Sequence, residues 1–100
     1  MLSYKIIDLS IIKESFVGYN KIEFYYDGDK LPDVFSKEAM ADLLMAFSVK
    51  DCHTMLKEAI GHNVKSMFNK ELSKEDKSLI LGLVNDINEN VKNRSDYEPK

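Results

Sequence analysis

Residues 73–91, SKEDKSLILGLVNDINENV, carry the pattern that decides the fold of this chain. Ser73 can cap the free backbone N–H groups at a helix start, and Glu75 and Asp76 place negative charge at the positive end of the helix dipole. A capping box prefers Glu or Gln at the position of Asp76, so we expect an imperfect box. The apolar residues that follow recur at helical spacing: Leu79, Ile80, Leu83, Val84, Ile87 and Val91. This pattern predicts a helix about 30 Å long. The rest of the chain must supply the core that buries its apolar face.

A second helical pattern occupies residues 36–68. Ser36 opens it in the same way as Ser73, and one face then carries Ala39, Met40, Leu43, Leu44 and Phe47. A further helix is predicted from about Asp51, with a stripe of Cys52, Met55, Leu56, Ala59 and Ile60. Gly61 suits a left-handed helix end, and Asn63 could cap a short third helix that carries Val64, Met67 and Phe68. The sequence therefore predicts three or four helices.

The residues before this helical region alternate with the period of strands. Ile7, Leu9 and Ile11 alternate with polar residues, which predicts a strand over the first half of residues 3–12. A short helix that begins after Asp8 or Ser10 is the competing interpretation, and residues 10–17 remain open between the two.

Residues 20–26 form the clearest strand pattern. Ile22, Phe24 and Tyr26 are predicted to share one face, with Lys21, Glu23 and Tyr25 on the other. Asp27-Gly28 is typical of a tight turn. Residues 29–35 then fit a short return strand, which must be an edge strand or a loop because Pro32 cannot donate a ladder hydrogen bond.

Together these patterns predict one α+β domain over residues 1–100, in which a small antiparallel sheet of two or three strands precedes three or four packed helices. We expect residues 1–35 to be mainly β, residues 36–92 to be helical and residues 93–100 to form a frayed polar tail. So small a sheet leaves open edges, and homo-oligomerisation through an edge or through exposed methionines such as Met45 is a further hypothesis.

Composition limits the cellular setting. The 100 residues include a single cysteine, Cys52, which cannot form an internal disulfide. Cysteine content therefore gives no indication of secretion. No apolar run approaches the ~20 residues that cross a membrane, and the first residues lack the pattern of a signal peptide. We therefore expect a cytoplasmic protein that does not bind membranes.

The charge is unevenly distributed. The chain has a net charge of −3, and residues 21–42 account for all of it, with six acids against three lysines. Proteins that bind nucleic acid usually present a basic face, so nucleic acid is an unlikely partner on these totals.

Candidate catalytic and metal-binding residues are few. Cys52 and His53 are adjacent, and neighbours on a helix point about 100° apart, so they are poorly placed to act as a thiol–imidazole pair. Cys52 also lies in the apolar stripe, which favours a buried and inert thiol. Asp51, Cys52, His53 and His62 show no familiar metal-ligand spacing. We expect no catalytic residue, no metal and no cofactor.

Residues 40–60 superficially resemble a helix-turn-helix unit, which makes a DNA-binding regulator the alternative function. The turn has no glycine, and Asp51 opens the segment that would be the recognition helix. Residues 50–77 hold six lysines against five acids, a net of only +1. This is a weak basis for phosphate contacts.

The acidic and aromatic stretch over residues 19–33 is the most suggestive feature. Tyrosine offers a large contact area with a polar tip, and surrounding acids are complementary to a basic partner. The ordinary interpretation is a solvated hairpin whose tyrosines pack on the helices. We favour a small acidic binding protein, an inhibitor or antidote such as the immunity protein of a bacterial toxin or a phage-encoded blocker. It would occlude the basic active site of a partner such as a nuclease. The predicted partner-binding residues are Tyr19, Glu23, Tyr25, Asp27, Asp29 and Asp33.

Overall fold

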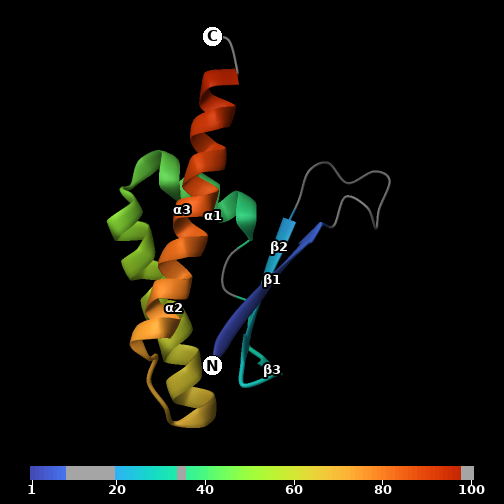
Figure 1. The fold of residues 1–100 in the computed structure, drawn as a ribbon, viewed down its shortest axis with the longest axis vertical. Helices are drawn as coiled ribbons and strands as arrows, with labels where there is room; N and C mark the ends of the chain where they lie inside the picture. The colour runs from blue at the N-terminus through green and yellow to red at the C-terminus, as the bar shows by residue number, and fades with distance from the viewer. Residues whose placement is uncertain (9–19, 34–35, 98–100) are drawn as a thin grey trace.

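The computed structural model of the chain describes residues 1–8, 20–33 and 36–97. In this part of the chain a three-stranded antiparallel sheet comes first and three helices follow (Figure 1). The predicted α+β class and the order of its two parts are confirmed.

The sheet has the strand order β1-β2-β3, formed by β1 (Leu2–Asp8), β2 (Asn20–Tyr26) and the short β3 (Asp29–Lys30). The β2–β3 turn is the predicted Asp27-Gly28 pair, with φ values of 51° and 89°. Positive φ at both central residues is the geometry that tight hairpins favour, and the Asp-Gly dipeptide tolerates it. Pairing between β2 and β3 covers only two residues, so the return strand is shorter than residues 29–35 allowed.

The predicted faces of β2 are correct, because Ile22, Phe24 and Tyr26 are buried. In β1, Leu2 pairs with Tyr26 and Tyr4 with Phe24, so both lie on the sheet face that meets the helices. Ile6 lies on the same face but is 44% exposed, and Ile7 lies on the opposite face. Leu2, at 3% exposure, decides this register. A one-residue shift would move every side chain to the other face. Leu9, Ile11 and the open segment 10–17 lie outside the described residues.

Helix α1 (Lys37–Ala46) begins after Ser36, whose Oγ accepts a hydrogen bond from the Ala39 N–H at 3.1 Å. Met40, Ala41 and Leu44 are buried against the sheet and the other helices. Phe47 does not join this stripe as predicted: it follows the last helical turn in an extended conformation and is 49% exposed.

Helix α2 (Val49–Phe68) is one continuous helix, so the predicted stop at Gly61 and the separate short helix from Asn63 are both wrong. A helical glycine costs about 1 kcal/mol relative to alanine. Burial of Cys52, Leu56, Ile60 and Val64 along one face outweighs that cost. The helix ends instead at Asn69, which adopts the left-handed conformation with φ 55° and ψ 39°.

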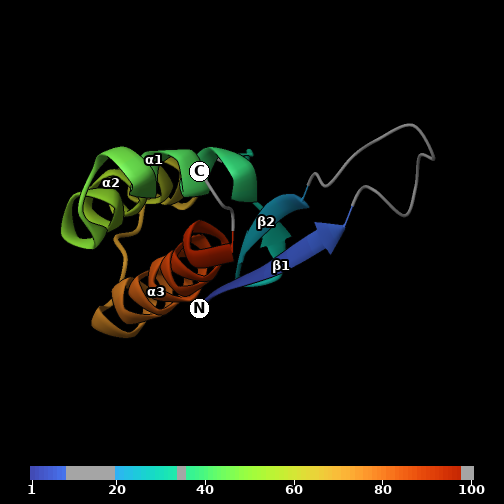
Figure 2. The same cartoon turned by 90° about the horizontal axis from the view of Figure 1, so that it is seen from above.

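Helix α3 (Lys74–Tyr97) runs the length of the helical layer and extends past the expected end near Val91. Ile80, Leu83, Val84 and Ile87 are buried, as the opening pattern predicts. Figure 2 shows that all three helices lie on one side of the sheet. Phe68 at the end of α2 reaches the sheet, where its ring contacts the Tyr26 ring at a centroid distance of 5.1 Å. None of the described helices combines the length and the apolar character needed to cross a membrane.

Candidate partner-binding surface

The outer sheet face, which we define by Lys5 of β1 and by Lys21, Glu23 and Tyr25 of β2, points away from the helices. The Tyr25 hydroxyl donates a 2.7 Å hydrogen bond to Oε1 of Glu23. The Lys5 ammonium lies 5.4 Å from the centre of the Tyr25 ring, within cation–π range. The tyrosine is therefore held in one orientation by a neighbour on its own strand and a neighbour on the next.

The hydrogen bond between Tyr25 and Glu23 also shifts the pKa of both side chains. Accepting from Tyr25, with Lys21 nearby, lowers the pKa of the Glu23 carboxyl below its usual value. The same bond to a carboxylate, reinforced by desolvation, raises the pKa of Tyr25. At neutral pH the pair is therefore a carboxylate that accepts from a protonated phenol.

Asp33 lies at the border of this face and is shared by two lysines. Its Oδ1 is 3.0 Å from the Lys30 Nζ, and its Oδ2 is 3.2 Å from the Lys21 Nζ. The hydrogen bond from Lys30, followed by the contributions of Lys21, lowers the pKa of the Asp33 carboxyl. Lys21 also lies 3.6 Å from Glu23, so one lysine serves two acids.

The hairpin turn and β3 carry the remaining acids. Asp27 pairs with the Met1 amino group, and its Oδ2 lies 3.9 Å from the Lys70 Nζ at the end of the helical layer. The amino group lowers the pKa of the Asp27 carboxyl. Asp29 is exposed in β3 and forms no ion pair within the described residues.

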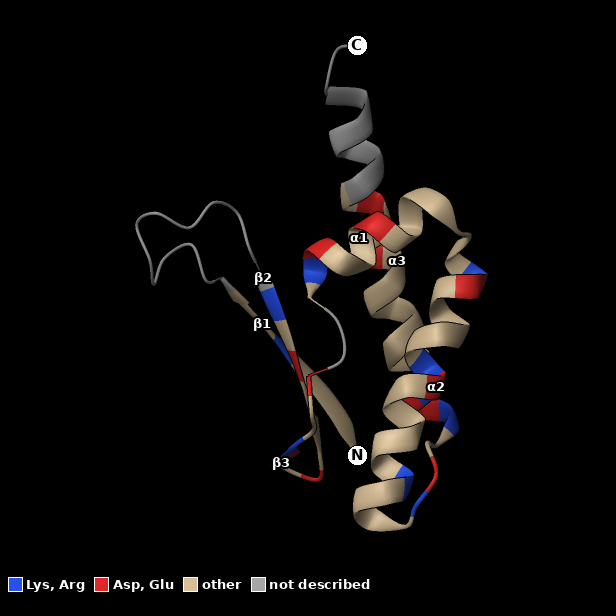
Figure 3. Ribbon diagram, turned by 180° about the vertical axis from the view of Figure 1, so that it is seen from behind, with Lys and Arg blue, Asp and Glu red and all other residues tan. Residues whose placement is uncertain are grey.

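The structure thus brings four of the six predicted binding residues to one sheet and its turn and places Asp33 just after β3, while Tyr19 lies outside the described residues. The acids do not form an uncompensated negative patch. Figure 3 shows basic and acidic positions interspersed along β2, the turn and β3. Sequence reasoning counted the lysines but could not place Lys21 and Lys30 beside Asp33, or Lys70 beside Asp27.

The other candidate residues lie elsewhere. Cys52 is fully buried, and burial followed by the nearby Asp51 charge raises the pKa of its thiol, which keeps it protonated and unreactive. His53 Nε2 is 3.0 Å from the Lys77 carbonyl oxygen. Because that oxygen can only accept, His53 donates and links α2 to α3. Among the residues described, no three His, Cys, Asp or Glu side chains form a group that could hold a metal ion.

The helix pair of residues 40–60 is present as the end of α1 and the start of α2, joined through Phe47 and Ser48. Ser48 caps α2 through a 3.1 Å hydrogen bond from the Asp51 N–H to its Oγ, so Asp51 belongs to the first turn of that helix. A role of this pair in DNA binding stays a prediction.

Comparison of the chain with protein-family models, with curated proteins and with solved structures found no match. Functional interpretation therefore depends on the surfaces of the molecule.

Proposed function

We propose that the protein is a small non-catalytic inhibitor or antidote that binds a basic protein partner through the outer sheet face and the adjoining hairpin turn. A partner that grips nucleic acid, such as a toxin nuclease, offers the complementary lysines and arginines. Binding would occlude its phosphate-contacting surface. The observation that carries the proposal is Tyr25, an aromatic side chain held in place by Glu23 and Lys5 on a face that no described helix covers.

Tyr25 fits the role of an anchor at the centre of such a contact. Tyrosine residues are enriched among the side chains that dominate binding energy, because they bury a large area and lose little entropy. The hydrogen bond to Glu23 and the contact with Lys5 restrict this side chain before any partner arrives. Restriction in advance reduces the cost of binding.

The acids contribute unequally in this proposal. Glu23 and Asp33 already interact with Lys21 and Lys30, so a partner arginine must compete with an internal cation for each. Asp29 is exposed without such a competitor in the described residues. Residues 20–33 carry four acids and two lysines, so a net negative charge remains to steer a basic partner.

The proposal is tested by comparing three tagged proteins in pull-downs from the native host, with elution by increasing salt. These are the wild type, the double variant Tyr25→Ala/Asp29→Lys, and the control variant Asp86→Lys. Asp86 is an exposed acid on α3 and belongs to neither the sheet nor its turn, so its reversal matches the charge change without altering a residue of the proposed surface. A basic protein captured by the wild type and the control but lost from the double variant is the expected result.

The captured protein is then purified and its affinity measured directly. We expect the double variant to bind at least about tenfold more weakly and with a shallower salt dependence than the control. Equal affinity of all three proteins would exclude this surface as the binding site.

A gel-shift assay with generic duplex DNA at low salt tests the alternative function. An acidic inhibitor should not shift DNA, whereas a regulator that uses residues 40–60 should.

A further inference from the structure

A cleft of about 320 Å³ lies between α2, the segment that joins α2 to α3, and the first turn of α3. Its volume falls within the range of small-molecule sites, roughly 300–1,000 Å³. The lining residues are Lys57, Glu58, Gly61, Lys65, Glu71, Leu72 and Lys77. This cleft is separate from the outer sheet face and uses none of its residues.

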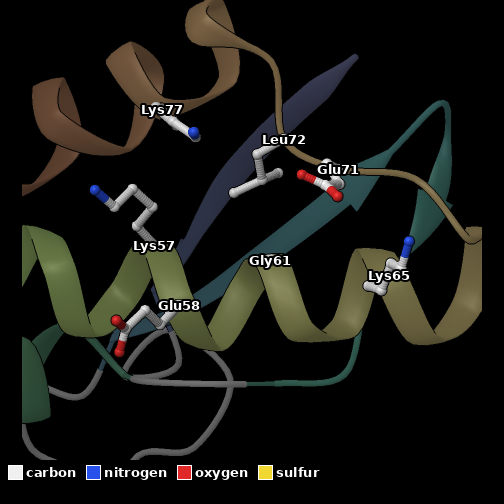
Figure 4. A pocket seen from close by; sticks show the side chains of 7 residues that line it. All are labelled: Lys57, Glu58, Gly61, Lys65, Glu71, Leu72 and Lys77. Carbon is white, nitrogen blue, oxygen red and sulfur yellow. The ribbon is translucent and has the colours of Figure 1, made fainter.

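The cleft is rich in lysine side chains. Lys57, Lys65 and Lys77 line it, and none of them forms an ion pair within the described residues. This contrasts with Lys21 and Lys30 on the sheet, which are both paired. Figure 4 shows the Lys57 and Lys77 side chains entering the space between α2 and α3 from opposite helices, while Glu58 points to the other side of α2.

An apolar surface lies beside these cations. Leu72, which is 9% exposed, sits between the two helices in the same view. Leu72 packs close to Gly61 of α2: a Cβ atom at position 61 would be in ordinary van der Waals contact with Leu72 Cδ1, at 3.6 Å. The His53 bond to the Lys77 carbonyl holds α3 against α2 at the Lys77 end of the cleft. The Glu71 carboxylate also lines the cleft, on the other side of Leu72 from the Lys57 and Lys77 ammonium groups in Figure 4. The site therefore joins two ammonium groups to an apolar floor, with that carboxylate at its far end.

We propose that this cleft binds a small phosphomonoester whose ester group is apolar. The phosphate would lie between Lys57 and Lys77, since lysine ammonium groups are common phosphate ligands and a dianion matches two cations. The ester group would lie on Leu72. The inference is independent of the proposed inhibitor function, because the two surfaces share no residue.

The pattern could have been read from the sequence. Lys57, Gly61 and Lys65 recur every fourth residue of α2 and so lie on one face of that helix. What the pattern does not contain is the approach of Lys77 and Leu72, which depends on how α3 packs against α2.

The test is a titration of the full-length protein with phenyl phosphate, followed by two-dimensional NMR of the backbone amides. We expect saturable shifts centred on Gly61, Leu72 and Lys77. The double variant Lys57→Gln/Lys77→Gln should raise the dissociation constant at least about tenfold. The control Lys50→Gln removes a lysine of the same helix that does not line the cleft and should bind like the wild type.

Two further probes separate the parts of the proposed site without changing the protein. Inorganic phosphate and phenol each carry one half of phenyl phosphate, so both should bind more weakly than the complete molecule. Equal binding of inorganic phosphate would overturn the role of Leu72. Shifts that do not saturate, or an equal loss in the Lys50→Gln control, would overturn the site as a whole.

Discussion

Replacing Asp76 with alanine should destabilise the protein far more than replacing the neighbouring Glu75. Asp76 is 3% exposed and its carboxylate accepts two backbone hydrogen bonds. Oδ1 accepts from the Leu2 N–H at 3.0 Å, and Oδ2 accepts from the Ser73 N–H at 3.2 Å. In return, the Asp76 N–H donates to the Ser73 Oγ at 3.1 Å. The capping box between Ser73 and Asp76, which the sequence predicts to be imperfect, is therefore complete. The same carboxylate also holds the start of β1.

The magnitude follows from what each N–H group loses. A hydrogen bond to a charged group contributes roughly 1.5–3 kcal/mol, and a buried N–H left without a partner costs a similar amount. Leu2 is buried, so its N–H loses the full contribution, about 3 kcal/mol. Ser73 is exposed and water can replace part of its bond, which leaves a loss of about 1 kcal/mol. The expected total is about 4 kcal/mol, a large share of the roughly 5–15 kcal/mol that stabilises a typical domain.

Urea denaturation followed by circular dichroism measures this loss. The matched control is Glu75→Ala, which removes the neighbouring exposed carboxylate and should cost no more than about 1 kcal/mol through the helix dipole. Asp76→Asn should lie between the two, because its side-chain oxygen can still accept one of the two bonds. A loss below about 1 kcal/mol for Asp76→Ala, or a loss equal to that of Glu75→Ala, would show that the two backbone hydrogen bonds to Asp76 do not stabilise the protein as expected.

The same contribution should depend on pH. Desolvation favours the neutral acid, but the hydrogen bonds from Leu2 and Ser73 outweigh it and lower the pKa of Asp76 below its ordinary value of 3.8. A carboxyl whose pKa is lowered by folding stabilises the protein above its unfolded-state pKa and loses this effect as the pH falls through its folded-state pKa. The difference in unfolding free energy between wild type and Asp76→Ala should therefore be constant near pH 7 and shrink below about pH 4. A difference that grows on acidification would contradict this assignment.

Further predictions concern four single positions. Gly82→Ala should stabilise the protein by about 1 kcal/mol, because no neighbouring side chain or other element of the described residues lies within 4 Å of the added Cβ. Gly28→Ala should destabilise the protein, because φ is +89° at that position. Thermal melts that show the opposite order of stability would contradict both predictions. Asn69→Ala should cost about 1 kcal/mol in the same melts, because Asn tolerates the left-handed helix end better than Ala, and an unchanged melting temperature would count against that conformation. Cys52 should react with iodoacetamide only at the rate of unfolding, so rapid alkylation of the native protein near neutral pH would show that the thiol is not buried.

Sequence reasoning succeeded where neighbouring residues decide the outcome. Ser73 and Asp76 mark the start of α3, and Asp27-Gly28 forms the turn between β2 and β3. Both features depend on local backbone chemistry. Sequence reasoning failed where distant contacts decide. Gly61 has the local properties of a helix end, but Leu72 packs against it and the buried stripe of α2 continues on both sides. The alternation around Ile7 does not show that Leu2 is buried, and the burial of Leu2 fixes the face of β1 that packs against the helices.

The candidate surfaces follow the same division. Tyr25 and Asp29 are predictable as outward-facing hairpin residues from the period of the strand. The pairing of Asp33 with Lys21 depends on how the chain returns along β2 after the turn, which the spacing of charges does not contain. The cleft between α2 and α3 is harder still to predict from the sequence, because it forms only when the two helices pack against each other.

The hydrogen bond between Leu2 and Asp76 also has a consequence for biosynthesis. Its partners are separated by 74 positions in the sequence, and β1 is made first while α3 is made last. While the ribosome is still adding the helices, the sheet can pair through its own hairpins but lacks the layer that buries Leu2 and Phe24. A two- or three-stranded sheet without such a layer is marginal in water. The nascent chain therefore completes its fold only after the start of α3 has left the exit tunnel, and an apolar strand face stays open to chaperones until then.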